Sequence, residues 1–303
     1  MNWNKYLAEL SQDQLIFIAL PIFFIAIIVE LAISRHNHQK LYHGKDLAVS
    51  LSMMIASAIV EFLPKLLAFI AFIHLHEISP LRDIVGRQWW AWGLLFFMDD
   101  FAYYWFHRLN HEVRLFWAGH VMHHSSEHMN FGTALRQGVG ERVHKFLFWI
   151  WIPLLGFDPL MIFTMISINL FYQYWVHTEL IDKLPAWYEQ IFNTPSHHRV
   201  HHASNIRYLD CNHAGVLILW DRLFGTYSEE IPEDKPVYGL TKNIDSFNPG
   251  YVITHEYQSI WSDVRSTSSW KDKLKYIFWA PGWSHNSQDL RAKTLRKQSG
   301  IKL

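Results

Sequence analysis

Residues 98–124 read MDDFAYYWFHRLNHEVRLFWAGHVMHH, and they decide the fold because they join an apolar stretch to two groups of histidines. The segment HRLNH (107–111) has histidines with i, i+4 spacing. The segment HVMHH (120–124) has histidines with i, i+3, i+4 spacing. On a helix, residues with these spacings lie on one face, so each group directs its imidazoles the same way. The stretch therefore predicts helices whose imidazoles form a metal site.

The segment HRVHH (198–202) repeats the second spacing further along the chain. Thr194 and the proline after it predict a helix start just before this group. His177, in QYWVH, is a ninth candidate at the end of an apolar run, whereas His197 and His213 are not expected to be ligands. The nine predicted metal ligands are His107, His111, His120, His123, His124, His177, His198, His201 and His202.

Nine imidazoles are too many for one zinc ion, whose catalytic sites use three protein ligands and a water. They suit two metal ions with four or five ligands each and open positions for oxygen. Carboxylate-bridged di-iron bundles use paired Glu-x-x-His motifs, and this chain does not carry two such pairs. A neutral shell of nitrogen atoms is compatible with iron, zinc or copper, so the spacing alone does not select the metal.

Four further residues are candidates for the shell around these ligands. Asp100 could accept an imidazole N–H and fix its tautomer, or it could be a helix-end carboxylate or the partner of an arginine. Gln173 lies one turn before His177. Glu127 and Asn130 follow the second group and could support ligands or line the site. The alternative for these last two is simple helix capping.

The composition favours a membrane protein and excludes several classes. Of the 303 residues, 50% are hydrophobic and 16% aromatic, and 18% are charged, against about 25% in soluble domains. Lys+Arg and Asp+Glu balance at 27 each, so no bulk field would attract nucleic acid. Cys211 is the single cysteine, which rules out an intramolecular disulfide and gives no sign of a thiolate metal site.

Apolar runs predict an all-α integral membrane protein with about four hydrophobic spans, the last of them a hairpin. The basic residues that follow the first and third spans place both of those loops on the cytoplasmic side. A returning hairpin keeps the histidines there too, under a polar cap over 228–303. The alternative is a soluble, all-helical protein. The predicted spans cover 14–34, 47–73, 89–106 and 146–176 of a single domain, 1–303.

Four segments together resemble the fatty acid hydroxylase/sterol desaturase superfamily. In chain order they are DDFAYYWFHRLNH, LFWAGHVMHHSSEHMNFGTALRQ, QYWVHTEL and TPSHHRVHHASNIRYLDCNHAGVLILWDRLFGTYSEE. The resemblance covers the expected catalytic core, 98–227, and its HHSSE…TALRQ wording is similar to the branch with alkylglycerol monooxygenases and bacterial sterol-desaturase-like proteins. It implies a membrane fold with a cytosolic di-metal site, and ligand roles for the same nine histidines. Some members have a tenth histidine where Gln173 stands.

The resemblance also implies two iron ions, which zinc can replace in purified protein, and O2 as co-substrate. We expect oxidation of a lipid C–H bond, with the fatty acyl, sterol or alkyl-ether substrate entering from the membrane. Hydroxylation is favoured; desaturation is the alternative, and ether cleavage uses the same apparatus. Because no flavin, dinucleotide or haem motif is evident, electrons must come from a separate electron-transfer protein or a reduced cofactor.

Two other classes remain open. One is a non-enzymatic metal-binding or transport membrane protein, which ionisable groups deep within the spans would favour. The other is a degenerate scaffold without activity. The expected location is a bacterial inner membrane or an ER-type membrane, with the active site on the cytoplasmic side.

Overall fold

The computed structural model describes residues 15–301, which are helical apart from connecting loops and two isolated β-bridges. The longer helices are α2 Leu15–His36, α3 Gly44–Val60, α4 Phe62–Ile78, α6 Trp89–Glu112, α7 Arg114–His124, α11 Pro159–Trp175, α15 Pro249–Arg265 and α16 Trp270–Phe278. The shorter ones are α5 Arg82–Val85, α8 Phe131–Ala134, α9 Arg142–Lys145, η1 Phe146–Phe148, α10 Trp151–Leu154, α12 Ala186–Glu189, α13 Pro195–His201, α14 Leu219–Phe224 and α17 Ala292–Gln298. The predicted all-α class is confirmed over this range; Gln14, where the first span was predicted to begin, lies outside it.

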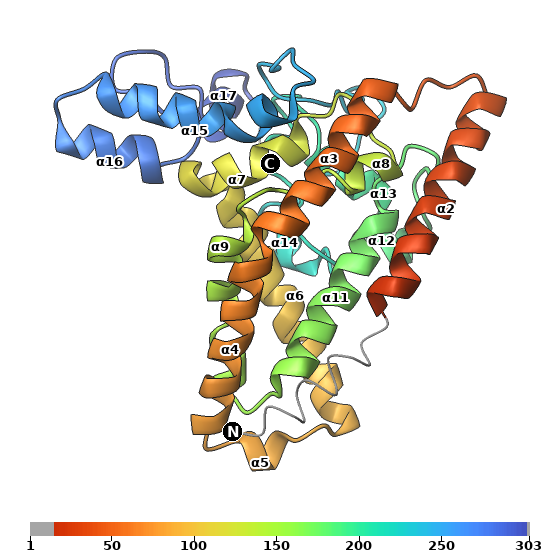
Figure 1. Ribbon diagram of the computed structural model, residues 1–303. Helices are drawn as coiled ribbons and strands as arrows, with labels where there is room; N and C mark the ends of the chain where they lie inside the picture. Colours follow the sequence, from red (N-terminus) through yellow and green to blue (C-terminus); the bar gives the residue numbers. More distant parts are fainter. Residues whose placement is uncertain (1–14, 302–303) are drawn as a thin grey trace.

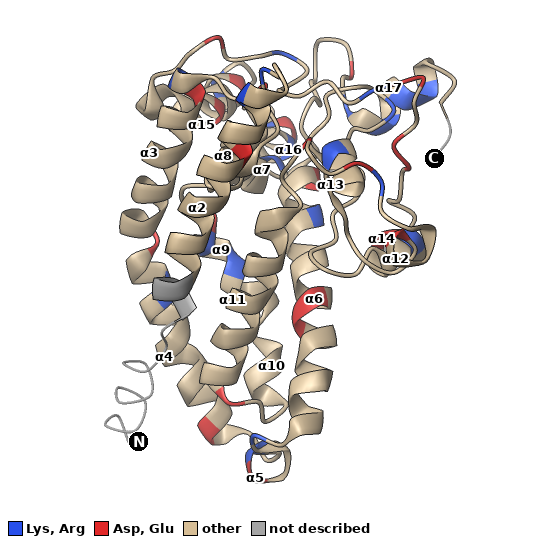
Figure 2. Ribbon diagram, turned by 90° about the vertical axis from the view of Figure 1, so that its right-hand side faces the viewer, with Lys and Arg blue, Asp and Glu red and all other residues tan. Residues whose placement is uncertain are grey.

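The lower parts of α4, α6 and α11 form a stem that ends at α5 (Figure 1). Its interior is a cluster of buried apolar side chains that includes Phe72, Leu95 and Trp149. Its exterior is also apolar, and Ile59 and Phe62 are 71% and 67% exposed at the α3–α4 bend. Figure 2 shows that charged residues gather in the cap and near α5, with few between. This distribution is typical of a chain that crosses a lipid bilayer.

By length and composition, one helix among the described residues could cross a membrane alone, over Ala19–His36. The predicted span 47–73 is divided between α3 and α4, which are bent by 45° at Glu61 and qualify only as a pair. Glu61 is buried at this bend, where it accepts from Ser57 and pairs with Arg142. The number of spans therefore stays a prediction.

In the predicted hairpin 146–176, the chain turns between Leu154 and Pro159, and the two arms have unequal lengths. The second arm is α11, which begins where the Asp158 carboxylate accepts from the Leu160 N–H, with Pro159 in its first turn. The first arm consists only of η1 and α10, because Pro153 cannot continue a helical hydrogen-bond pattern. Gly156, at φ +89°, lies so close to the Leu81 backbone that a Cβ would not fit. The first arm is therefore too short to be a membrane helix.

The cap is formed by α7, α13, α15, α16, α17 and the loops between them (Figure 1). Its connection to the stem is direct, because α6 ends and α7 begins at Val113. Arg114, at the start of α7, holds the C-terminal segment through Glu256 and Asp263 of α15, at 2.7 Å each. All the predicted ligands lie where the stem meets this cap.

Candidate metal centre

Three helices and one loop bring the predicted ligands together. The last turns of α6 and α7 supply the histidines of 107–111 and 120–124. The short helix α13 supplies those of 198–202 and starts at Thr194 as predicted, although the Thr194 side chain does not cap the backbone. Its hydroxyl contacts Glu189 instead, at 3.1 Å. His177 lies two residues beyond the end of α11.

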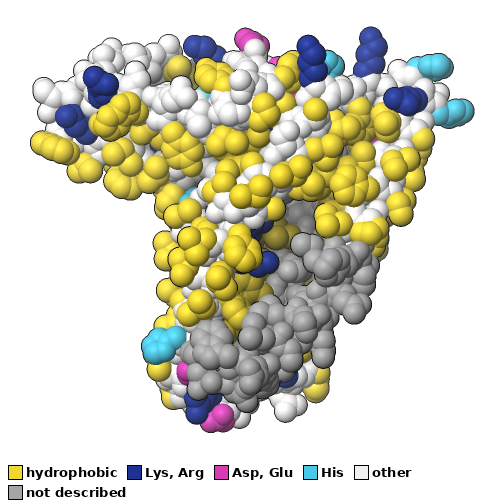
Figure 3. Space-filling model, in the orientation of Figure 1, with side chains coloured by type: hydrophobic (Ala, Val, Ile, Leu, Met, Phe, Trp, Pro, Cys, Tyr) yellow, Lys and Arg dark blue, Asp and Glu magenta, His cyan; other side chains and the backbone are white. Residues whose placement is uncertain are grey.

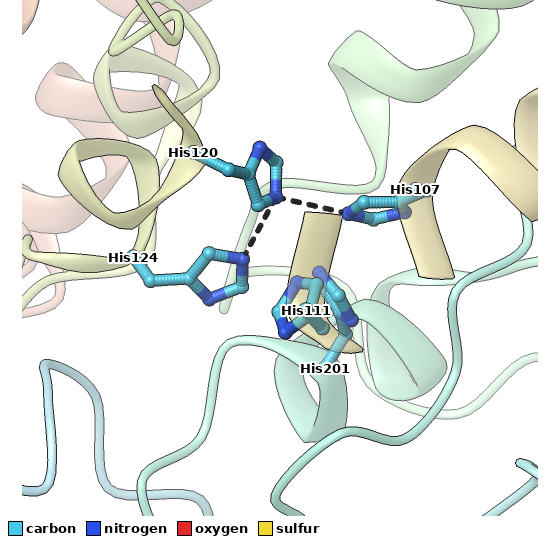
Figure 4. A group of neighbouring side chains, drawn as sticks. All are labelled: His107, His111, His120, His124 and His201. Atoms are coloured by element: carbon cyan, nitrogen blue, oxygen red, sulfur yellow. Dashed lines mark hydrogen bonds between the residues drawn. The ribbon is translucent and has the colours of Figure 1, made fainter. Parts of the chain in front are cut away.

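The nine histidines form two adjacent groups, and every member is buried. The ligand nitrogens of each group lie within 4.8 Å of one another. The groups touch where the rings of His124 and His202 stack at 4.4 Å between centroids. The first group is His107, His111, His120, His124 and His201 (Figure 4), and the second group is His123, His177, His198 and His202.

The hydrogen bonds of the first group fix which nitrogen carries the proton. His107 Nδ1 lies 2.8 Å from the His213 carbonyl oxygen, and His120 Nδ1 lies 2.9 Å from a Glu141 oxygen. A carbonyl or a carboxylate only accepts, so both Nδ1 atoms are protonated and both Nε2 atoms carry a lone pair. These two Nε2 atoms are 3.1 Å apart, one of the close approaches drawn in Figure 4. Two facing lone pairs repel unless a cation lies beside both.

The second group repeats this arrangement. His123 Nδ1 donates to the Arg136 carbonyl at 3.1 Å, and His177 Nδ1 donates to the Gln173 carbonyl at 2.8 Å. Their Nε2 atoms are then left facing each other at 3.3 Å. Each group therefore contains at least one pair of opposed lone pairs, and such a pair fits one metal ion.

Imidazoles must be neutral to bind a metal ion, and the environment favours this form at several of the nine histidines. Burial lowers the pKa of His201 to about 3 and that of His177 to about 4. Burial, and then the neighbouring imidazoles, hold the pKa of His107 and His202 well below the usual value. The Nε2 atoms of His111 and His201 are buried without a hydrogen-bond partner among the described residues. An unpaired buried nitrogen is costly, and a metal ion would satisfy it.

Asp100 does not have the contact that we expected. Its carboxylate accepts from the Val216 and Leu217 N–H groups at 2.8 and 2.9 Å and from Trp220 Nε1 at 3.0 Å. Its hydrogen-bond partners among the described residues include no imidazole, because the buried backbone of this loop needs an acceptor of its own. Asp100 therefore fixes the loop after His213 and acts on the histidines only indirectly.

The other three outer candidates also contribute differently. The backbone carbonyl of Gln173 holds His177, while its side chain donates to Asn169 at 2.6 Å. Asn130 caps α8, accepting from the Thr133 N–H at 3.1 Å. Glu127 is exposed, on a shallow depression beside the site. Capping, the alternative considered for Glu127 and Asn130, is thus what Asn130 does.

Glu141 and Asp210 are outer residues that the sequence did not indicate. Burial raises the pKa of Glu141, but His120, Lys145 and His144 together lower it by more, so the carboxyl stays ionised and accepts from His120. Asn110 donates to the same carboxylate at 2.6 Å. Asp210 lies 3.5 Å from His111 Nδ1. Neither residue has helical spacing to its histidine, so no sequence pattern could have found them.

His213 was expected to be structural, and its backbone is: the carbonyl holds His107, and the N–H donates to Asp221 at 2.8 Å. Its ring is fully buried and lies 5.0 Å from the ring of His111. Neither ring nitrogen has a hydrogen bond of normal geometry among the described residues. His213 thus places a tenth buried imidazole beside the first group. His197, as predicted, belongs to neither group.

A cavity of about 600 Å³ opens onto the centre from the cap side. Histidines of both groups form its floor, and Trp117 and Val121 of α7 line one wall. Other parts of the cavity wall come from α15 and from the 239–244 loop, which includes Lys242. The lining is mixed in polarity, so the cavity can receive a molecule with both a polar and an apolar part.

Fold and site together define a helical protein with two adjacent imidazole groups, each able to hold a metal ion. Comparison with known proteins shows what the chain resembles. Residues 92–226 match the model of the fatty acid hydroxylase family, and this match confirms the resemblance to the hydroxylase/desaturase superfamily. No solved structure matches the chain.

Three proteins illustrate what the chain is similar to. An alkylglycerol monooxygenase of Xenopus tropicalis is 40% identical over 86% of this chain and 58% of its own length. An ornithine lipid hydroxylase of Rhizobium tropici is 29% identical over 48% of this chain and 44% of its own. A Delta(7)-sterol 5(6)-desaturase of Gibberella zeae is 24% identical over 52% and 48%. The chain thus spans little more than half of the first of these, and the names support a lipid-oxidising oxidoreductase.

Proposed function

We propose that this chain is a membrane-embedded di-iron oxygenase that hydroxylates a C–H bond of a lipid with O2. The observation that carries the proposal is the pair of opposed Nε2 lone pairs in each imidazole group. A transporter would place its ligands deep within the spans, whereas these nine lie where the stem meets the cap. A degenerate scaffold would have no reason to retain two complete groups.

The chain's own residues hold and orient the imidazoles. The carbonyls of His213, Arg136, Gln173 and Cys211 and the carboxylate of Glu141 each fix one ring, which leaves Nε2 free to bind metal. When bound, an iron pair supplies the activation of O2 that C–H oxidation requires. The surrounding burial excludes bulk water, which would otherwise consume a reactive oxidant.

An alkyl ether of glycerol is the substrate class that we favour, because two alkylglycerol monooxygenases are 40% and 39% identical to this chain. The reaction consumes the C–H bond, O2, two electrons and two protons, and it yields an alcohol and water. At the carbon beside the ether oxygen, the alcohol is a hemiacetal, which breaks into an aldehyde and glycerol. The two electrons come from a separate electron-transfer protein or a reduced cofactor.

Lipid desaturation is the second candidate, favoured by the sterol desaturase among the relatives. It uses the same two electrons but removes two hydrogens and leaves an alkene. We further propose that the centre faces the cytoplasm, in a bacterial inner membrane or an ER-type membrane. The support is the excess of basic residues in the loops after the first and third predicted spans.

The test uses the purified full chain in lipid with a chemical or protein reductant, ¹⁸O2 and an alkylglycerol. Hydroxylation predicts an aldehyde that carries ¹⁸O when it is trapped at once, and a His201→Ala control that forms none. An alkene without ¹⁸O would establish desaturation instead. If the iron-loaded protein with a competent reductant consumes neither alkylglycerol nor any other lipid, both candidate functions are contradicted.

A further inference from the structure

Helices α15 and α16 form a hairpin that projects sideways from the cap (Figure 1). Along α16, Trp270, Leu274 and Phe278 recur every fourth residue, so they form one stripe on the helix. Their exposed fractions are 76%, 53% and 54%. On α15, Tyr257 and Trp261 are exposed with the same spacing. An exposed apolar face of this size on an otherwise polar segment indicates a surface that binds something.

Most charges of the hairpin are sorted by direction, and the one carboxylate of α16, Asp272, lies 3.8 Å from Lys275. The acidic residues of α15, Glu256 and Asp263, face inward and pair with Arg114. Of the cations, Arg265 and Lys271 are exposed, and Lys273 lies 5.1 Å above the ring of Trp270. Cations therefore flank the aromatic stripe, while the carboxylates of α15 are already neutralised within the protein. Such a surface is complementary to an apolar layer with anionic groups at its edge.

Figure 3 shows that hydrophobic side chains gather on the side of the hairpin that faces along α4, and that they continue over α3 and α4. The hairpin lies across the direction of the stem (Figure 1). If the stem crosses a bilayer, the stripe then lies at the level of the headgroups rather than in water. The same aromatic and basic residues are those enriched at membrane interfaces.

We propose that the α15–α16 hairpin is an in-plane membrane anchor that binds the surface of an anionic phospholipid bilayer. This inference rests on the membrane-embedded setting of the proposed function, but not on the metal or the reaction. Arg114 ties the hairpin to α7, since its side chain holds α15 and its N–H donates to the Trp279 carbonyl at 3.0 Å. Because α7 carries three of the imidazoles, the anchor sets the height of the centre and its cavity above the lipid.

The test measures the depth of one side chain in the bilayer. Cys211 is fully buried, so a cysteine introduced at Leu274→Cys can be labelled selectively with an environment-sensitive fluorophore. The full chain is reconstituted in nanodiscs of phosphatidylcholine with phosphatidylglycerol and with spin-labelled lipids. We expect a blue-shifted emission and a depth about 5–10 Å below the surface. The matched control is Ser262→Cys, which is exposed on the opposite side of α15 from Tyr257 and should report water.

A second variant tests the charge argument. Lys271→Glu with Lys273→Glu should reduce the quenching at position 274 in anionic nanodiscs and leave it unchanged in purely zwitterionic ones. Emission at 274 that matches the control at 262 would overturn the proposal. Burial of 274 that persists in detergent and follows protein concentration would also overturn it, because a second copy would then cover the stripe. The depth of residue 274 can be measured in protein without activity. A failure of the proposed reaction can therefore be distinguished from a failure of the membrane anchor.

Discussion

The two imidazole groups are alike in their opposed lone pairs but differ in what lies behind them. In the first group, His120 is held by the Glu141 carboxylate and His111 lies near Asp210. In the second group, His123 and His177 are held by backbone carbonyls. A carboxylate behind an imidazole makes it a more basic ligand than a carbonyl does. The two groups therefore differ in the basicity of their ligands, and we expect the first group to bind its metal ion more tightly.

Removing one ligand from each group gives the largest expected effect. His107→Ala should empty the first site and His198→Ala the second, so each protein should retain about one metal ion per chain. Both should lose turnover by more than about 100-fold, because ligand loss exceeds the 10–100-fold cost of losing an outer partner. Metal analysis and lipid product formation measure the two effects. Full activity in either variant would contradict the assignment of that group.

Glu141→Gln tests the difference in metal affinity between the two groups, because it changes only the first group. The neutral amide still fits beside His120 but no longer supplies a negative charge, so metal affinity at this site should fall about 10–100-fold. Competition with a chelator measures it. Gln173→Ala is the matched control in the second group, since its backbone carbonyl, not its side chain, holds His177. Equal metal loss in the two variants would contradict the proposed difference between the carboxylate-supported group and the carbonyl-supported group.

The metal-free protein should lose stability in acid through both groups. The pKa of His201 is about 3 and that of His177 about 4 when folded, against about 6.5 when unfolded. Below about pH 6.5 the unfolded chain therefore takes up protons that the folded chain does not. The free energy of unfolding should be highest above about pH 6.5 and fall toward pH 4. Denaturation curves at pH 7.5 and pH 5 measure this, and equal stability at the two would contradict it.

Asn130→Ala should have a smaller effect, on stability alone, because Asn130 lies outside both groups. The change removes the cap of α8 and a 2.6 Å bond to the Leu41 carbonyl. We expect a loss of about 1–3 kcal/mol in the free energy of unfolding and an unchanged metal content. Calorimetry with metal analysis checks both. Loss of a metal ion would instead make Asn130 part of the shell around the ligands.

His36→Ala should have the smallest effect of all. His36 ends α2, is exposed and belongs to neither group. Turnover and metal content should match those of the unaltered chain, measured side by side. A clear loss of either would show that the division of the twenty histidines into ligands and bystanders is wrong.

The nine clustered histidines could be predicted because helical spacing is local. Residues three or four apart share a face whatever the rest of the chain does, so each short group was directed as expected. The acceptors behind them could not be predicted in the same way. The His213 carbonyl reaches His107 from 106 positions away, and Glu141 reaches His120 from 21. Such contacts depend on how helices and loops pack, which no spacing encodes.

Asp100 shows that helical spacing can predict the face on which a residue lies but not its partner. It lies on the same face as His107, but the buried 216–220 loop brings three N–H groups to its carboxylate first. The hairpin prediction failed in part for a similar reason. Pro153, Gly156, Asp158 and Pro159 indicate the turn, yet hydropathy does not register that an apolar arm can be built from short turns instead of one helix.

The central claim is that each imidazole group holds one metal ion. Anomalous diffraction at the iron edge, from crystals of the iron-loaded full chain, tests it most directly. We expect two peaks, one among His107, His120 and their group, and the other among His123, His177 and their group. A single peak shared by both groups, or peaks outside them, would contradict it.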